Sequence, residues 1–258
     1  MRRRSVSTEP RLPRLHVLVS ERELGDPPGS GSPRDPDDRC GPGDRCGPGG
    51  LAAVERVLER AAPLAIHLRA RISARRLFEV ADRLAPIASR AGGWLVVNGR
   101  PDVALAAGAR AVQLGRTALG VEETRRMVRA CAGRLAIGAS VHDAEGALRA
   151  AREGAEYIVL GTIYATPSHP GVEGSGPAAV SAVRRRLTAH RLAVHRPSAR
   201  RPPPILAIGG IGADRIEEVT EAGAYGIVVG RAVWSAPDPA RAALGLRRQL
   251  DRLDRRDG

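Results

Sequence analysis

Short apolar runs alternate with stretches of helical periodicity along most of the chain. The runs are four or five residues long and consist mainly of Val, Ile, Leu and Ala. Near-continuous apolar runs, in place of strict alternation, indicate parallel strands that are covered on their outer faces. Eight runs fit this description: Leu15–Val19, Leu64–Leu68, Trp94–Val97, Ala111–Leu114, Leu135–Gly138, Tyr157–Leu160, Ile205–Ile208 and Gly226–Val229.

The strict order of strand and then helix predicts one parallel sheet, and eight such units favour a closed barrel over an open doubly wound sheet. A pattern of Gly-Ala, a strand and a second Gly recurs from Gly108, Gly154 and Gly223, on the fourth, sixth and eighth predicted strands. Repetition on alternate strands is what the layered interior of a barrel produces. We therefore predict an α/β fold, a single (β/α)8 TIM barrel over residues 15–250.

Four segments fall outside this repeat. Residues 26–50 are mostly Gly, Pro, Asp and Arg with almost nothing to bury, which predicts a disordered insertion after the first strand. A basic, Pro-rich loop is expected over residues 188–204, on the side away from the chemistry because it precedes a strand. A flexible N-terminus over residues 1–14 and a charged tail over residues 251–258 complete the predicted organisation.

The charge balance is strongly basic, with a formal net charge of +13. All 41 basic residues are Arg, which coding bias explains better than selection for a nucleic-acid face, and aromatic residues that stack on bases are not interleaved with them. No apolar run approaches the length of a membrane span, and the N-terminus lacks the apolar stretch of a signal peptide. We expect a cytoplasmic protein with no specific nucleic-acid partner and no membrane partner, and leave a homo-oligomer open.

The cysteines point to a reducing compartment. Cys40, Cys46 and Cys131 are too few for a disulfide framework, and their number is odd. No His or further Cys lies near enough to the first two to complete a zinc site. The repeat RCGPGDRCGPGG that contains them is therefore interpreted as an incidental loop sequence.

In a parallel barrel the reacting groups come from the loops that follow the strands. Gly209 and Gly210 follow the seventh strand and Gly230 the eighth, each before a helix, where backbone N–H groups and the helix dipole favour an anion. A phosphate is the natural ligand for that position. The competing interpretation is that each glycine only makes a tight turn.

His142 is the one His at the carboxyl end of a predicted strand. The pKa of an unperturbed imidazole lies near 6.5, so the ring both accepts and donates a proton at neutral pH. The competing interpretation is that Asp143 or Glu145 holds the ring at the start of the next helix. His67, the last residue but one of the second predicted strand, is a second candidate for the barrel mouth.

Four stretches carry a likeness to known proteins: VVNGRPDVALAAGARAVQLG, IGASVHDAEGALRAAREGAEYIVLGTIYAT, GVEGSG and AIGGIGADRIEEVTEAGAYGIVVGRAV. They follow one another from the third to the eighth predicted strand. With them, the chain from Leu15 to Leu250 resembles the superfamily of thiamine phosphate synthase and the TenI-type thiazole tautomerases. The resemblance implies a (β/α)8 barrel, the fold that the strand count predicts independently.

The synthase branch joins a pyrimidine diphosphate to a thiazole phosphate, and its pattern implies magnesium held by an Asn-Asp pair after strand three and an Asp after strand four. Here the pair reads Asn98-Gly99, and residues 116–118 after the fourth strand read Arg-Thr-Ala. Mg²⁺ normally needs a carboxylate besides diphosphate oxygens. Two synthase lysines also align with Arg71 and His169, and Arg does not freely replace Lys at a reacting phosphate.

The Ser-Val-His segment, which supplies the catalytic His of the tautomerase branch, is intact. We therefore expect a TenI-type thiazole tautomerase that aromatises its substrate by proton transfer, with His142 as the proton carrier and with no metal or organic cofactor. Two alternatives stay open: a thiamine phosphate synthase, which alone would use Mg²⁺, and a non-catalytic sensor of a thiazole or thiamine phosphate. The residues expected to bind the substrate or its phosphate are Arg69, Arg71, Asn98, Gln113, Ser140, Thr162, Thr166, His169, Gly209, Gly210, Gly230 and Arg231.

Overall fold

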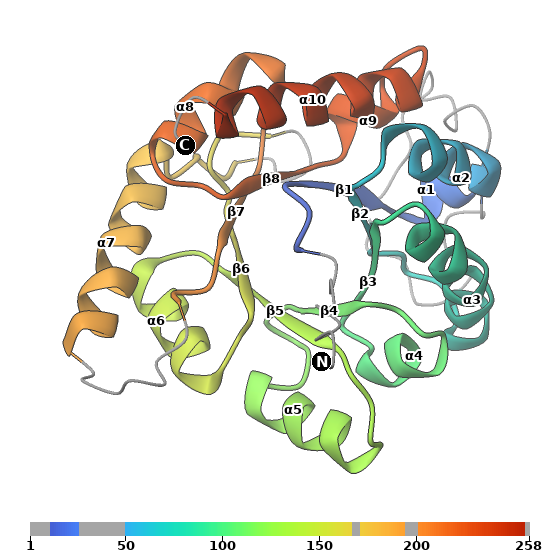
Figure 1. Cartoon of the computed structure of the whole chain (residues 1–258), viewed down its shortest axis with the longest axis horizontal. Helices are drawn as coiled ribbons and strands as arrows, with labels where there is room; N and C mark the ends of the chain where they lie inside the picture. Colours follow the sequence, from blue (N-terminus) through green and yellow to red (C-terminus); the bar gives the residue numbers. More distant parts are fainter. Residues whose placement is uncertain (1–10, 26–49, 167–170, 194–200, 256–258) are drawn as a thin grey trace, which may run out of the picture.

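Eight parallel strands close into a barrel that is surrounded by helices (Figure 1). The structure, a computed structural model, describes residues 11–25, 50–166, 171–193 and 201–255. Each strand pairs in parallel with the next one along the chain, and β8 pairs with β1 to close the ring. The predicted barrel is thereby confirmed. The strands are β1 Leu15–Val19, β2 Ala65–Leu68, β3 Trp94–Asn98, β4 Ala111–Leu114, β5 Ala136–Val141, β6 Tyr157–Leu160, β7 Ile205–Ile208 and β8 Gly226–Val229.

The helices lie outside this ring of strands, as Figure 1 shows. Their apolar faces pack on the outer side of the sheet and form the larger of two buried apolar clusters. The bounds are α1 Glu21–Leu24, α2 Gly50–Ala61, α3 Ala74–Arg90, α4 Pro101–Ala106, α5 Val121–Ala130, α6 Ala144–Glu153, α7 Pro177–Ala193, the 3-10 turn η1 Ala213–Arg215, α8 Ile216–Glu221, α9 Arg231–Trp234 and α10 Pro239–Asp254.

Local sequence signals explain where α6 begins and ends. The Asp143 side chain accepts a hydrogen bond from the Gly146 N–H at 2.6 Å, which satisfies one of the donors left free at a helix start. Gly154 ends the helix with φ of 93°, a left-handed conformation that glycine adopts without a Cβ clash. Gly108 and Gly223 also have positive φ. The first glycine of the recurring sequence pattern therefore lets the chain turn from helix to strand.

A second, smaller apolar cluster fills the barrel interior. Tyr157 is its largest fully buried side chain, and Gly138 on β5 makes room for it, because a Cβ at Gly138 would lie 2.1 Å from the Tyr157 Cζ atom. Leu12 packs against this cluster, and its carbonyl accepts a hydrogen bond from the Tyr225 hydroxyl at 2.6 Å. The segment before β1 therefore closes the amino-terminal end of the barrel.

Several predicted boundaries differ from the observed ones. Residues 11–14, predicted as part of a flexible terminus, are held in place by the contacts of Leu12 and Arg14. Helix α7 continues through residues 188–193, which were predicted to be a loop, and α10 takes up residues 251–254 of the predicted tail. Of the predicted insertion only Gly50 is described, as the first residue of α2; residues 26–49 lie outside the described part.

No helix within the described ranges has the length and apolar character that a membrane crossing requires.

Candidate active site

His142 directly follows β5, so its imidazole lies at the carboxyl end of the barrel. The ring Nδ1 lies 2.6 Å from the Gly161 carbonyl oxygen, which follows β6. Because a carbonyl oxygen only accepts, Nδ1 carries the proton and donates to it, and the neutral ring keeps a free lone pair on Nε2. Asp143 does not hold the ring, because its side chain caps α6 instead. Glu145 does not hold it either, because its carboxylate pairs with Arg186 at 2.8 Å, so the alternative in which one of these two acids holds the ring is not observed.

The glycines after β7 serve mainly to let another segment approach. Gly209 and Gly210 have φ of 108° and 61°. A Cβ on Gly209 would lie 2.7 Å from the Thr162 Cγ2 atom, so the loop after β6 packs against the end of β7. The prediction that these glycines open a helix is wrong, because the next turn begins at Ala213 and has Gly212 before it.

The loop after β6 is further fixed by a cluster that sequence reasoning missed. The Tyr164 hydroxyl donates to Glu218 at 2.5 Å, and the Arg215 guanidinium lies 4.2 Å from the centre of the Tyr164 ring. Desolvation, with the Glu218 hydrogen bond, raises the pKa of Tyr164 to about 12, so the hydroxyl stays protonated. Arg215 also donates to the Gly210 carbonyl at 2.7 Å. Only contacts between distant segments reveal this cluster.

A layer of polar side chains lies where the strands leave the interior. Asn98 and Gln113 are paired in register on β3 and β4, and Gln113, only 2% exposed, donates to the Ser140 hydroxyl at 2.9 Å. The amide oxygens of Asn98 and Gln113 are buried and have no hydrogen-bond partner among the described residues. The structure therefore brings three predicted substrate-binding residues together in one layer.

Below this layer two histidines share a hydrogen bond inside the barrel. His16 Nδ1 and His67 Nε2 are 2.6 Å apart, and His16 Nε2 lies 2.9 Å from the Pro13 carbonyl oxygen. Burial lowers the pKa of His16 to about 3, and burial together with the charge of His16 lowers the pKa of His67 well below its usual value. Both rings are therefore neutral at physiological pH. The sequence suggested that His67 lines the mouth, whereas its side chain is fully buried.

Four exposed arginines follow the strands at the mouth: Arg69 after β2, Arg116 after β4 and Arg231 after β8, with Arg71 two residues beyond Arg69. The Arg71 backbone N–H donates to Glu21 at 3.0 Å. Gly230 precedes Arg231 and accepts from two N–H groups of the short helix α9. These arginines come from three separate loops on the same end of the barrel.

Two predicted substrate residues lie at or beyond the limit of the described loop. Thr166 is the last described residue before the gap at 167–170, and His169 lies outside the described residues. Thr162, by contrast, is well placed beside Gly209, and its carbonyl accepts from the Ser175 N–H at 2.9 Å.

The described residues at the mouth include no group of side chains that could hold magnesium. Over the part of the chain that the structure describes, no three His, Cys, Asp or Glu side chains are grouped so that they could hold a metal ion. Gly99 and the Arg-Thr-Ala sequence at 116–118 stand where carboxylates would be needed. Arg100 is bound to the nearby carboxylate of Asp102 by two hydrogen bonds, of 2.9 and 2.6 Å, which ties that carboxylate to a cation.

Comparison with known proteins decides the family. The family described as thiamine monophosphate synthase matches residues 42–233, well over half of the chain. This protein belongs to that family. A thiamine-phosphate synthase from Thermus thermophilus is 39% identical over 186 residues, covering 72% of this chain and 82% of the relative. One from Saccharopolyspora erythraea is 41% identical over 180 residues, covering 69% and 74%.

Solved structures agree with the membership of the synthase family. A thiamine phosphate pyrophosphorylase from Pyrococcus furiosus matches with a TM-score of 0.68 and 25% identity, over 93% of this chain and 96% of that one. A 3-hexulose-6-phosphate synthase matches with a TM-score of 0.57 but only 19% identity, which shows the shared fold alone.

The comparisons correct the predicted activity. The expectation of a TenI-type tautomerase, an isomerase, rested on the Ser-Val-His segment and on the missing carboxylates. Relatives that are about 40% identical across most of the chain are instead named thiamine-phosphate synthase. The alternative of a synthase is therefore the better interpretation, and the role of His142 as a proton carrier in aromatisation is withdrawn.

Proposed function

We propose that this protein joins a pyrimidine diphosphate to a thiazole phosphate, forming thiamine phosphate and releasing diphosphate. The observation that carries the proposal is the 39–41% identity to enzymes named for this reaction, over about 70% of the chain. The closed barrel, with its polar and basic groups gathered at the carboxyl ends of the strands, is consistent with it.

The reaction is a displacement at the methylene carbon attached to the pyrimidine. The thiazole nitrogen contributes its lone pair to a new C–N bond, the C–O bond to the diphosphate breaks, and its electron pair leaves with the diphosphate. The thiazole ring becomes a cation, and no proton has to be removed from it. The protein must therefore orient two substrates and stabilise negative charge that develops on the leaving group.

We propose that the negative charge of the diphosphate leaving group is stabilised by the guanidinium groups of Arg69, Arg71 and Arg116. Guanidinium groups bind phosphate oxygens through charge-assisted, often bidentate hydrogen bonds. Because no three His, Cys, Asp or Glu side chains of the described residues are grouped so that they could hold a metal ion, no step is routed through magnesium. Arg116 also stands at one of the positions where the family pattern has its magnesium-binding segment.

The second substrate is assigned to the other side of the mouth. The phosphate of the thiazole is assigned to the Arg231 guanidinium and to backbone N–H groups near Gly209, Gly210 and Gly230, of which only Gly230 directly precedes a helix. Thr162 and Thr166 are assigned to the same substrate. His142, held by Gly161, presents Nε2 as an acceptor for a ligand N–H, while Asn98, Gln113 and Ser140 form the floor.

The test is to incubate the purified chain with both substrates and measure thiamine phosphate by mass spectrometry. We expect product only when both substrates are present. Arg116→Gln should reduce kcat/KM by about tenfold or more, the value of one lost charge-assisted contact. Arg60→Gln, an exposed arginine at the end of α2, should leave it unchanged. Absence of product at high enzyme concentration would dispose of the proposal.

A further inference from the structure

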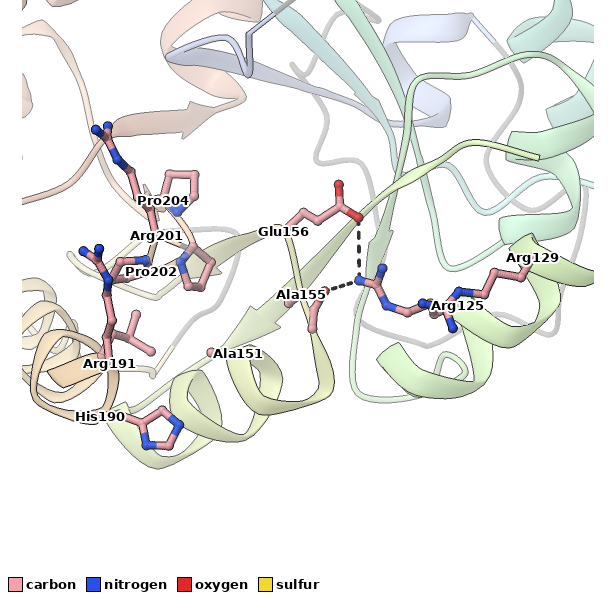
Figure 2. Close-up of a pocket in the computed structure, with 13 residues that line it drawn as sticks. Arg125, Arg129, Ala151, Ala155, Glu156, His190, Arg191, Arg201, Pro202 and Pro204 are labelled. Carbon is pink, nitrogen blue, oxygen red and sulfur yellow. Dashed lines mark hydrogen bonds and ion pairs between the residues drawn. The ribbon is translucent and has the colours of Figure 1, made fainter. Parts of the chain in front are cut away.

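A cavity of about 730 Å³ opens at the end of the barrel opposite the mouth. Its walls are the segments that precede β6 and β7 and the last turns of α5 and α7, all of which lie at the amino-terminal ends of strands. Figure 2 shows Arg125 and Arg129 on one side of the Ala155–Glu156 segment, and His190, Arg191 and Arg201 on the other. The proposed reaction uses none of these residues.

The charge around this cavity is strongly unbalanced. Four arginines line it, and Glu156 is the one carboxylate among the lining residues that the structure describes. Glu156 lies 3.6 Å from Arg125, which also donates to the Gly154 carbonyl. Within the described part of the chain, Arg129, Arg191 and Arg201 have no hydrogen bond or ion pair through their side chains. Two of these unpaired cations, Arg191 and Arg201, therefore lie on the same side of the Ala155–Glu156 segment, and Arg129 lies on the other side (Figure 2).

The rest of the wall is apolar. Pro202, Pro203 and Pro204 form one side, with Leu187 and Ala151 from the flanking helices. The volume falls within the range of sites that bind small organic ligands and is far larger than one phosphate requires. Cations beside a rigid, apolar wall suit a ligand that carries both phosphates and an organic portion.

We propose that this cavity binds the diphosphate group of a small organic phosphate, such as a nucleoside diphosphate, at a site separate from the mouth. Arg191 and Arg201 contact the phosphate oxygens, and the proline wall beside them packs on the organic portion. Free inorganic diphosphate carries the same charged group and is the other ligand that would bind in this way. The inference does not depend on the proposed reaction, because no residue is shared by the two sites.

Binding is tested on the ¹⁵N-labelled full chain with ADP and with inorganic diphosphate, at about 0.15 M salt so that long-range charge effects are screened. We expect both probes to shift the amide signals of Gly154, Ala155 and Glu156. The double variant Arg191→Gln, Arg201→Gln should lower the affinity measured from these shifts by about tenfold or more, since two charge-assisted contacts are lost. Arg60→Gln removes the same kind of charge elsewhere and should leave the affinity unchanged.

The comparison between probes identifies the source. Tighter binding of ADP shows that the organic portion contributes, and equal binding shows that the diphosphate group alone is recognised; both results support the site. Shifts confined to the carboxyl ends of the strands would overturn the proposal, and so would equal weakening in the Arg60→Gln control or equal binding of sulfate. Thiamine phosphate formation, assayed in the same variants, reports separately on the proposed reaction.

Discussion

His16 and His67 face each other across neighbouring strands inside the barrel, with their ring nitrogens 2.6 Å apart. The Pro13 carbonyl fixes the direction of the protons. Since that oxygen only accepts, His16 Nε2 donates to it, His16 Nδ1 accepts, and His67 Nε2 must donate. The pair forms a one-way chain of hydrogen bonds in which the remaining nitrogen, His67 Nδ1, is an acceptor.

This chain predicts the tautomer of both rings. ¹⁵N NMR at pH 7 should show His16 and His67 as neutral rings protonated on Nε2, whereas His142 should be protonated on Nδ1, because its Nδ1 donates to Gly161. A spectrum in which His67 carries its proton on Nδ1 would refute the assigned direction.

The same pair makes stability depend on pH. The pKa of each buried His is lower in the folded than in the unfolded protein, so the unfolded state binds more protons as pH falls below about 6.5. The free energy of unfolding should therefore fall between pH 7 and 5.5, by up to about 1.4 kcal/mol per pH unit for each ring. Urea unfolding at several pH values measures this, and a flat profile over that window would contradict it.

The approach of the loop after β6 to Gly209 gives a prediction about packing. Gly209→Ala places a Cβ 2.7 Å from Thr162 in a left-handed backbone conformation, so we expect a loss of about 1–3 kcal/mol in the free energy of unfolding. Gly230→Ala is the matched control, because its φ is −126° and the nearest atom to an added Cβ lies 3.9 Å away. Equal destabilisation by the two changes would show that the close approach is unimportant.

A fourth prediction concerns His142 as a residue that contacts the substrate. His142→Ala should lower kcat/KM by about tenfold, and His142→Gln should recover part of the loss by offering an acceptor in place of Nε2. His190→Ala, at the other end of the barrel, is the control and should have no effect. An unchanged kcat/KM in His142→Ala would remove this residue from the site.

Periodicity was sufficient to predict the barrel, because strands buried on both faces must be apolar throughout. Each predicted strand begins within one residue of the observed one, although β5 continues to Val141, past the predicted Gly138, where polar Ser140 interrupts the apolar run. The interior polar pair of His16 and His67 was not predictable, since a lone His in a strand reads as a core residue until its partner is known.

The predicted branch of the superfamily, the tautomerases, was also wrong. The Ser-Val-His segment pointed toward a tautomerase, and the missing carboxylates pointed away from a synthase, but similarity over most of the chain favours the synthase. A single retained motif carries little information about which reaction a barrel performs, because sites and not folds determine the chemistry. The substituted residues at 99 and 116–118 instead raise the question of how the diphosphate is held.

The dependence of the reaction on Mg²⁺ tests most directly whether arginine side chains hold the diphosphate. Thiamine phosphate formation should be measured in Mg²⁺ and in excess chelator, for the unmodified chain and for Arg116→Gln. If guanidinium groups hold the diphosphate, the unmodified chain should lose less than about tenfold in rate on chelation, and the variant should be slow in both conditions. A reaction that is abolished by the chelator and unaffected by Arg116→Gln would contradict the account.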